Sequence, residues 1–303
     1  MGLAVAPAPA PAVMGEVVAA ALVAHQPLVM LPHDLRVHLG ETGRDTTLVE
    51  PGFRCLREHF AARRVDTLLI VDTHWLTTSE HVIAGAAHFT GTYTSDEMPR
   101  AIHDLAYDYP GTPELAEAVV AAGRERDLPV VNATADSLPA HYPTLNLVHH
   151  LRTSERVLSV GVLQTAGPAH FLAFGECLAA AVASDRGGGR VAVVGSGGMS
   201  HTFWPIDQQR GRVALDPRHV ISDAAREWDR RLLDLWADGD HAEVVDLQPE
   251  YRAVRPEGGF GHYLTLLGAI GGRGCRAPGR RVSEYENALG TGQVHVVFDL
   301  EPR

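Results

Sequence analysis

The sequence has few of the features that mark secreted, membrane or metal-ribbon proteins. Its 303 residues include only three cysteines, Cys55, Cys177 and Cys275, which are far apart and odd in number. We therefore expect neither a disulfide framework nor a zinc site of the CxxC kind, and a cytoplasmic location fits this cysteine usage. No apolar run reaches the roughly 18 residues of a membrane span, so we expect no membrane segment.

Clustered positive charge is also missing. The formal net charge is -11, and Lys and Arg form no run. Binding to a nucleic-acid backbone needs grouped positive charge, so we expect no nucleic-acid partner. The chain is 45% apolar and 21% charged, which is typical of a globular enzyme with a sizeable core.

The N-terminal stretch, residues 1–16, reads MGLAVAPAPAPAVMGE. Alternating prolines prevent a helical apolar region, and no basic residues precede it, so we interpret the stretch as a flexible tail rather than a signal peptide. Residues 17–303 show no internal repeat, change of composition or long linker. They are expected to form one domain.

Within this domain, buried strands alternate with helices. Apolar runs predict strands at residues 67–72, 128–131, 156–163, 190–195 and 294–300, and residues 17–29 predict a first strand that ends near His25 and turns at Pro27. Helical spacing and capping signals predict helices at residues 51–64, 113–126, 169–184, 219–237 and 261–270. This alternation predicts an α/β fold, a single layered domain whose central sheet, mostly parallel or mixed, is flanked by helices.

Histidines are numerous, 17 in all, and two of them follow predicted strands. In open α/β sheets, ligands bind beyond the carboxyl ends of the strands. His25 follows the first strand in LVAHQP, and His74 ends LLIVDTHW, where Asp72 could orient its imidazole. Taken alone, a histidine placed like His25 is more often structural, whereas His74 could equally be structural or catalytic.

Two glycine-rich loops add further polar side chains. GSGGMSH, residues 195–201, follows a strand and delivers His201, but it lacks the GxGxxG and GxxxxGK spacings of nucleotide sites. RPEGGFGH, residues 255–262, carries Glu257 ahead of an apolar helix, where a helix-dipole role is the alternative explanation. His141, between two prolines in SLPAHYPTLN, is a fifth candidate.

Two histidines and one glutamate can form the facial triad that binds non-haem Fe(II) and leaves three positions open. Two open positions can take the vicinal hydroxyls of a catechol, and the third can take dioxygen. Additional histidines could then act as acid and base. The spacing of the residues alone does not establish that these loops converge.

The motifs together resemble the class III extradiol ring-cleaving dioxygenases, the superfamily that includes protocatechuate 4,5-dioxygenase. Within it, the resemblance is strongest to the homoprotocatechuate (3,4-dihydroxyphenylacetate) 2,3-dioxygenases. It covers nearly the whole chain after the tail. It rests on AHQP, VDTHWL, HFTGTYTSDEMPRAIHDLAYDYPGTPEL, GSGGMSH, LWADGDHAE, QPEY and GTGQVHVVF, in this order.

The resemblance implies an Fe(II) cofactor and a set of site residues. His25 and His74 match the two iron-binding histidines of the family, and Glu257 matches its carboxylate ligand. His201 matches the histidine that hydrogen-bonds dioxygen and acts as acid and base. His141 matches a second pocket histidine found in part of the superfamily.

A second carboxylate competes for the metal. Glu284, in SEYENALGTGQ, is the alternative ligand, and Glu257 is preferred because its neighbouring glycines leave the carboxylate room to reach a metal. Arg36, Arg252 and Arg255 are candidate partners for an acidic group on the substrate.

The implied reaction is cleavage of a small aromatic diol, such as 3,4-dihydroxyphenylacetate, with O2 to a muconic semialdehyde. Alternatives are the same iron chemistry on a 2-aminophenol, a gallate-like compound or a hydroxypyridine, and a non-catalytic subunit of the same fold. We also expect a homo-oligomer.

Overall fold

A computed structural model of the chain describes residues 14–39, 43–184, 186 and 188–301. Most of the predicted tail, residues 1–13, lies outside the described residues. The first strand begins at Glu16, which is close to the predicted domain boundary. In the described part of the chain, no helix has both the length and the apolar character needed to cross a membrane.

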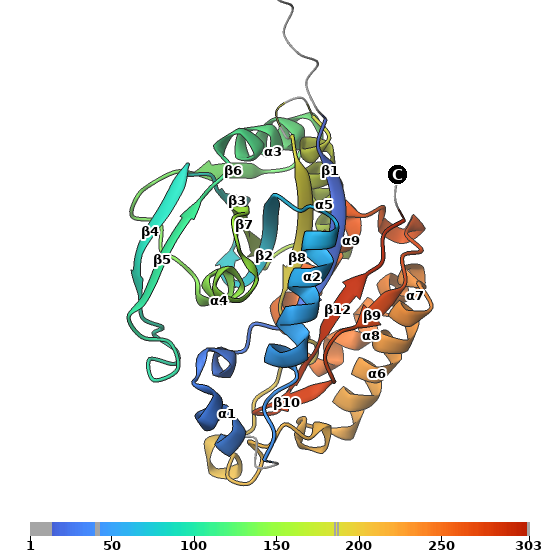
Figure 1. The fold of residues 1–303 in the computed structure, drawn as a ribbon. Helices are drawn as coiled ribbons and strands as arrows, with labels where there is room; N and C mark the ends of the chain where they lie inside the picture. The colour runs from blue at the N-terminus through green and yellow to red at the C-terminus, as the bar shows by residue number, and fades with distance from the viewer. Residues whose placement is uncertain (1–13, 40–42, 185, 187, 302–303) are drawn as a thin grey trace, which may run out of the picture.

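Within the described residues, eight strands form one mixed sheet in the order β6-β3-β7-β2-β8-β1-β12-β9 (Figure 1). Their bounds are β1 (Glu16–Val23), β2 (Thr67–Thr77), β3 (His81–Ala84), β6 (Val130–Ala133), β7 (Arg156–Leu163), β8 (Arg190–Ser196), β9 (Gly279–Arg281) and β12 (His295–Phe298). The central strands β7, β2, β8 and β1 are parallel, and antiparallel pairs flank them. The predicted layered α/β fold is confirmed.

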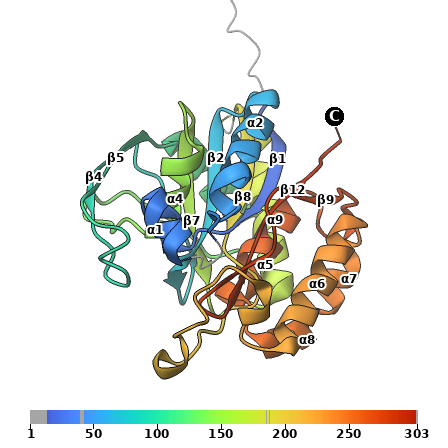
Figure 2. The ribbon, with the colours of Figure 1, turned by 60° about the horizontal axis from the view of Figure 1, so that its bottom comes forward.

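Helices cover both faces of this sheet (Figure 2). One face packs against α3 (Pro113–Glu125), α5 (Pro168–Val182), α6 (Asp223–Ala237) and α9 (Gly261–Ala269), and the other against α2 (Arg54–Ala62) and α4 (Tyr142–Leu151). Shorter helices are α1 (His33–Leu39), α7 (His241–Asp246) and α8 (Gln248–Tyr251).

Strand β2 shows why the sheet is covered on both sides. Leu69 and Val71 belong to the core under α3, α5 and α9, whereas Leu68 and Ile70 belong to the core under α2 and α4. Successive side chains of a strand point to opposite faces, so a continuous apolar run buries both.

Two smaller antiparallel pairs stand outside the main sheet. They are β4 (His88–Tyr93) with β5 (Leu105–Pro110), and β10 (Glu286–Ala288) with β11 (Thr291–Gln293). Figure 1 shows the β4–β5 pair at one side of the molecule, beyond α4. Neither pair was predicted from the sequence. Glu97, in the loop between β4 and β5, and Gln293 of β11 both belong to the candidate site described below.

Several predicted elements are longer than the observed ones. The first strand, expected to end near His25 and turn at Pro27, ends at Val23, and Pro27–Met30 forms a 3-10 turn. The helix expected from residue 51 begins at Arg54, after an irregular helical turn that contains Pro51. The helix expected from residue 219 begins at Asp223 because Ser222 Oγ caps it, accepting a hydrogen bond from the Ala225 N–H at 3.1 Å.

The register of the central strands aligns three segments at one edge of the sheet. Val23 of β1 and Asp72 of β2 both pair with Ser196 of β8. His25 and His74 each follow their strand's paired residue by two positions. An irregularity between Asp72 and Leu76 interrupts the pairing of β2 with β7, and bulges of this kind re-aim side chains next to active sites.

Candidate metal centre

Three predicted ligands converge at this edge. His25, His74 and Glu257 each offer one ligand atom, and these atoms all lie within 4.8 Å of one another. His25 Nε2 is 3.1 Å from Glu257 Oε1, and His74 Nε2 is 3.6 Å from the same oxygen. The structure therefore brings together residues from three distant parts of the chain.

The spacing of these atoms fits a single divalent ion. Two ligands at right angles, each bonded at about 2.1 Å, lie about 3 Å apart. The two measured nitrogen–oxygen separations are close to this value. Two imidazoles and one carboxylate are also the donor set of the facial triad, so the residues present fit Fe(II).

The backbone holds Glu257 against the glycine-rich loop that follows β8. The Glu257 N–H donates to the Met199 carbonyl at 3.0 Å, and the His201 N–H donates to the Arg255 carbonyl at 2.9 Å. These two bonds flank an isolated antiparallel bridge between Ser200 and Pro256, which pairs residues 199–201 with residues 255–257. Glu257 and His201 are thereby fixed relative to each other.

The carboxylate of Glu257 is held at both oxygens. Thr73 Oγ1 donates to Oε1 at 2.7 Å, and the Gly198 N–H donates to Oε2 at 2.5 Å. The next residue, Gly258, has a φ of +53°, and a Cβ there would lie 2.8 Å from Thr73 Cγ2. Glycine is therefore required at this position if Thr73 is to reach the carboxylate.

Each histidine ring is fixed through its Nδ1 atom. His25 Nδ1 lies 2.9 Å from Ser196 Oγ, and His74 Nδ1 lies 2.8 Å from Glu97 Oε1. A carboxylate only accepts, so His74 Nδ1 carries the hydrogen, which leaves Nε2 for the centre when the ring is neutral. Glu97 comes from the loop between β4 and β5, and nothing in its sequence context indicated this contact.

Asp72 does not orient an imidazole, contrary to the sequence-based prediction. Its Oδ1 accepts from the backbone N–H groups of His74 at 2.9 Å and Trp75 at 3.1 Å, and its Oδ2 accepts from Thr144 Oγ1 at 2.6 Å. The carboxylate is fully buried and lies at the strand end. It shapes the backbone that presents His74 instead of touching the ring.

The electrostatics of the centre favour a cation. Burial raises the pKa of Glu257, but the imidazoles of His25 and His201 outweigh it and hold that pKa well below its usual range. Burial lowers the pKa of His74, but the carboxylates of Glu257 and Glu97 outweigh it and raise that pKa to about 9. The negative field that retains a proton on His74 would also stabilise a metal ion.

His201 lies beside the candidate ligands. Its Nε2 is 3.8 Å from Glu257 Oε2, and the residue lines the same cavity. His141 lies elsewhere, since its ring stacks on Trp75 at 5.6 Å and it is not among the residues that line the cavity. Its predicted catalytic role remains a prediction.

The residue after His141 occupies the cavity instead. The hydroxyl of Tyr142 lies 2.9 Å from His74 Nε2, and its ring is 4.5 Å from that of His74. Tyr142 is the first residue of α4, with His141 at the N-cap. Its closeness to His141 in PAHYP was the only signal that the sequence offered for it.

The cavity combines polar and apolar side chains. It is lined by His25, Gln26, Pro27, Leu28, Glu97, Met98, Tyr142, His201, Phe203, Glu257, Ala288, Leu289, Thr291 and Gln293. No Lys or Arg is among these described residues. Arg36 is committed to Asp45, with Nε at 2.7 Å from Oδ1, and Arg252 lines a separate hollow.

Glu284 is excluded from the centre by its position. Its side chain is 60% exposed and pairs with Arg44 at 3.0 Å. Among the described residues, it belongs to no group of side chains that could hold a metal, whereas Glu257 does.

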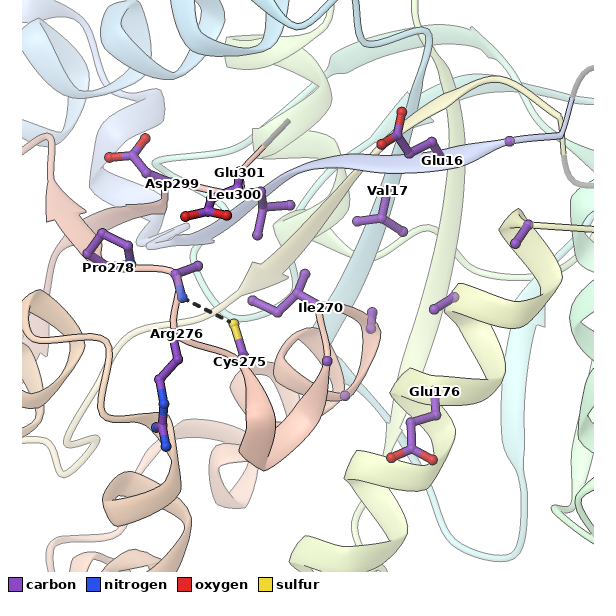
Figure 3. A pocket seen from close by; sticks show the side chains of 17 residues that line it. Glu16, Val17, Glu176, Ile270, Cys275, Arg276, Pro278, Asp299, Leu300 and Glu301 are labelled. Carbon is purple, nitrogen blue, oxygen red and sulfur yellow. Dashed lines mark hydrogen bonds between the residues drawn. The ribbon is translucent and has the colours of Figure 1, made fainter. Parts of the chain in front are cut away.

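A larger hollow of about 610 Å³ lies at the other end of β1 (Figure 3). Glu16, Glu176, Asp299 and Glu301 contribute carboxylates there, and Cys275 contributes a thiol. None of its described lining residues is a histidine, and it is remote from the strand ends that carry the candidate ligands. It is not the metal centre.

Comparison with known proteins finds relatives of this chain. The family described as the catalytic LigB subunit of aromatic ring-opening dioxygenase matches residues 19–299. The 3,4-dihydroxyphenylacetate 2,3-dioxygenase of Escherichia coli is 32% identical over 211 residues, 68% of this chain and 74% of that protein. A 2-aminophenol 1,6-dioxygenase beta subunit from a Pseudomonas species is 24% identical over 200 residues, 61% of this chain and 63% of that subunit.

A solved structure shares the fold. The crystal structure of uncharacterized protein JW3007 from Escherichia coli K12 matches with a TM-score of 0.51 and 16% identity, covering 81% of this chain and 91% of that one. At this identity the match concerns the fold alone.

Proposed function

This chain belongs to the catalytic LigB family of aromatic ring-opening dioxygenases, extradiol enzymes that act on catechol-like substrates, and we propose that it works with Fe(II) held by His25, His74 and Glu257. The observation that carries the proposal is the convergence of the three ligand atoms within 4.8 Å. We further propose a catechol such as 3,4-dihydroxyphenylacetate as substrate, cleaved with O2 to a muconic semialdehyde, on the strength of the Escherichia coli relative.

Fe(II), when bound, would supply Lewis-acid and redox chemistry toward the catechol and O2. The chain's own residues hold the ligands of the ion in position. Ser196 and Glu97 orient the ligand rings of His25 and His74, and Thr73 with Gly198 orients the Glu257 carboxylate. Preorganised ligands of this kind need no rearrangement when the ion enters.

Proton transfer would fall to two residues of the cavity. His201 is assigned to accept a proton from a substrate hydroxyl at Nε2 and to return it to an oxygen of the ring-opened product, because Nε2 lies beside Glu257 at the cavity wall. The hydroxyl of Tyr142, next to His74 Nε2, is assigned to hydrogen-bond the substrate oxygen nearest that ligand. We prefer Tyr142 to His141 for this second role because Tyr142 lines the cavity.

The test is anaerobic reconstitution with Fe(II), followed by oxygen uptake with 3,4-dihydroxyphenylacetate and observation of a yellow product. We expect about one iron per chain and stoichiometric oxygen consumption. Protein that binds no Fe(II), or that consumes no oxygen with any catechol, would contradict the proposal and favour a non-catalytic subunit of the same fold. Gel filtration of the same sample tests the expected homo-oligomer.

A second substrate class is favoured by the cavity itself. Among the described residues that line it, none is Lys or Arg, so no cation is in place to pair with an acidic side group. One relative is named for 2-aminophenol, which has no such group. Turnover of 2-aminophenol far faster than of any catechol would select this alternative.

A further inference from the structure

We propose that Gln26 determines substrate specificity, its side-chain amide donating a hydrogen bond to an acceptor on the ring's side group. The proposal rests on the proposed function and extends it. It defines the substrate class as phenolic rings that carry a hydrogen-bond-accepting side group, as opposed to bare or alkyl-substituted rings.

The carboxamide of Gln26 is buried without a partner. The residue is 5% exposed, and in the part of the chain that the structure describes neither Nε2 nor Oε1 has a hydrogen-bond partner. Buried polar groups are nearly always hydrogen-bonded, so such an amide calls for an explanation. Gln26 lines the cavity of the metal centre, directly after the ligand His25, so we assign a bound substrate as the partner that this amide lacks.

The local backbone does not need this side chain. Gln26 precedes the turn Pro27–Met30, and its carbonyl accepts a hydrogen bond from the Val29 N–H at 3.1 Å. Its side chain makes no capping bond to the turn. An apolar residue of the same length, such as methionine, would satisfy this backbone without burying an unpaired amide.

Two other side-chain donors of the cavity already have a protein partner. Gln293 Nε2 donates to Thr291 Oγ1 at 2.8 Å, and the Tyr142 hydroxyl lies 2.9 Å from His74 Nε2. The charged members of the lining, apart from histidines, are the carboxylates of Glu97 and Glu257. The N–H groups of Gln26 differ from these because they have no partner among the described residues, so they are free to donate to an acceptor on the substrate's side group.

The experiment compares two phenols that cannot be cleaved as catechols, 4-hydroxyphenylacetate and p-cresol, which differ only in the carboxylate. Dissociation constants are measured by anaerobic calorimetry, with and without Fe(II), for the wild type and for Gln26→Met. We expect Gln26→Met to weaken 4-hydroxyphenylacetate about tenfold, the contribution of one hydrogen bond, and to leave p-cresol unchanged.

A charge variant sharpens the test. Gln26→Glu removes the donor and adds a negative charge, so we expect it to weaken 4-hydroxyphenylacetate more than Gln26→Met does, again with little effect on p-cresol. Gln208→Met, at an exposed position outside the cavity, is the matched control and should change neither constant. Iron content and melting temperature of each variant show that the fold and the metal site persist.

Two results would overturn the proposal. Equal weakening of both phenols would mean that Gln26 supports the cavity wall or holds a water molecule, and unchanged constants would mean that its amide does not meet the ligand. Failure of the proposed function looks different, because wild-type protein would then bind no Fe(II) or cleave no catechol. The ratio of the two phenol affinities can still be read in that case.

Discussion

His74 Nδ1 lies 2.8 Å from Glu97 Oε1, a contact between strand β2 of the main sheet and the loop that joins β4 to β5. Among the described hydrogen bonds, this is the one that joins a candidate ligand to the β4–β5 segment. It fixes both the tautomer and the direction of the His74 ring, which points Nε2 toward Glu257.

Replacing this partner should weaken metal binding without removing a ligand. We expect Glu97→Gln to raise the Fe(II) dissociation constant about tenfold, because the neutral amide is a poorer acceptor for Nδ1. Competition with a chelator measures the change. Asp96→Asn removes the same charge from the neighbouring exposed position and should leave the dissociation constant at its wild-type value. If both variants raised the constant equally, Glu97 would act through its charge alone and not through its hydrogen bond to His74.

Ligands and proton-transfer residues should separate in their effects on iron. We predict that His74→Ala abolishes iron retention because it removes one of three donors, while His201→Ala retains iron and slows turnover about a hundredfold or more. Metal analysis and steady-state kinetics on the same preparations decide this. Equal iron content in the wild type and His74→Ala would contradict the ligand assignment.

The hydroxyl of Tyr142 can be removed without changing the ring's packing. We expect Tyr142→Phe to bind iron normally and to lower kcat about tenfold, since the ring contacts with His25 and His74 persist and only the hydrogen bond is lost. His141→Phe is the matched neighbour, because its ring lies on Trp75. A larger loss of turnover from His141→Phe would return the second proton-transfer role to His141.

The carboxyl edge of the sheet and its two histidines could be predicted because the pattern of apolar and polar residues along the sequence indicates them. A buried apolar run ends where polar residues begin, and parallel strands share a carboxyl edge, so His25 and His74 had to lie near each other. Glu257 needed the family resemblance, because nothing in its spacing indicates that residues 255–257 pair with residues 199–201.

Other parts of the site depend on contacts that no local pattern encodes. His141 and Tyr142 are adjacent at the start of α4, and successive helical residues point about 100° apart, so the sequence could not tell which ring enters the cavity. Glu97 reaches His74 only because β4 and β5, which were not predicted, carry their loop back to the sheet edge. The sequence suggested that Asp72 orients an imidazole, but its Oδ1 accepts hydrogen bonds from the backbone N–H groups of His74 and Trp75 instead.

A buried carboxylate behind the site should be important for stability. Asp229 of α6 is fully buried and accepts hydrogen bonds from Ser200 at its N–H and hydroxyl, from Tyr251 and from Tyr285. Asp229→Asn places an amide among these donors, and we expect a loss of about 3 kcal/mol in the free energy of unfolding.

Urea denaturation measures this loss, with Asp234→Asn as the control on the exposed side of the same helix. Because Ser200 precedes His201, Asp229→Asn should also slow turnover. Matching unfolding curves for the two variants would show that the network contributes nothing net.

Acid sensitivity should depend on a histidine far from the metal centre. His81 is buried, stacked at 3.7 Å on Phe174 and at 5.1 Å on His170, and within the described residues its ring nitrogens have no hydrogen-bond partner. Burial lowers the pKa of His81 to about 3, from an ordinary value of 6.5. The unfolded chain therefore binds a proton that the folded chain excludes, and stability falls as the pH drops from about 6.5 toward about 3.

His81→Phe removes this penalty and keeps an aromatic ring against Phe174. While the native ring stays neutral, His81 contributes a loss of about 1.4 kcal/mol per pH unit. We expect the variant to lose less stability than the wild type between pH 6.5 and pH 4.5, as measured by urea unfolding at several pH values. His103→Phe, at an exposed site, should follow the wild-type slope; if His81→Phe follows it too, the ring of His81 is reached by water or paired in solution, and acid unfolding has another origin.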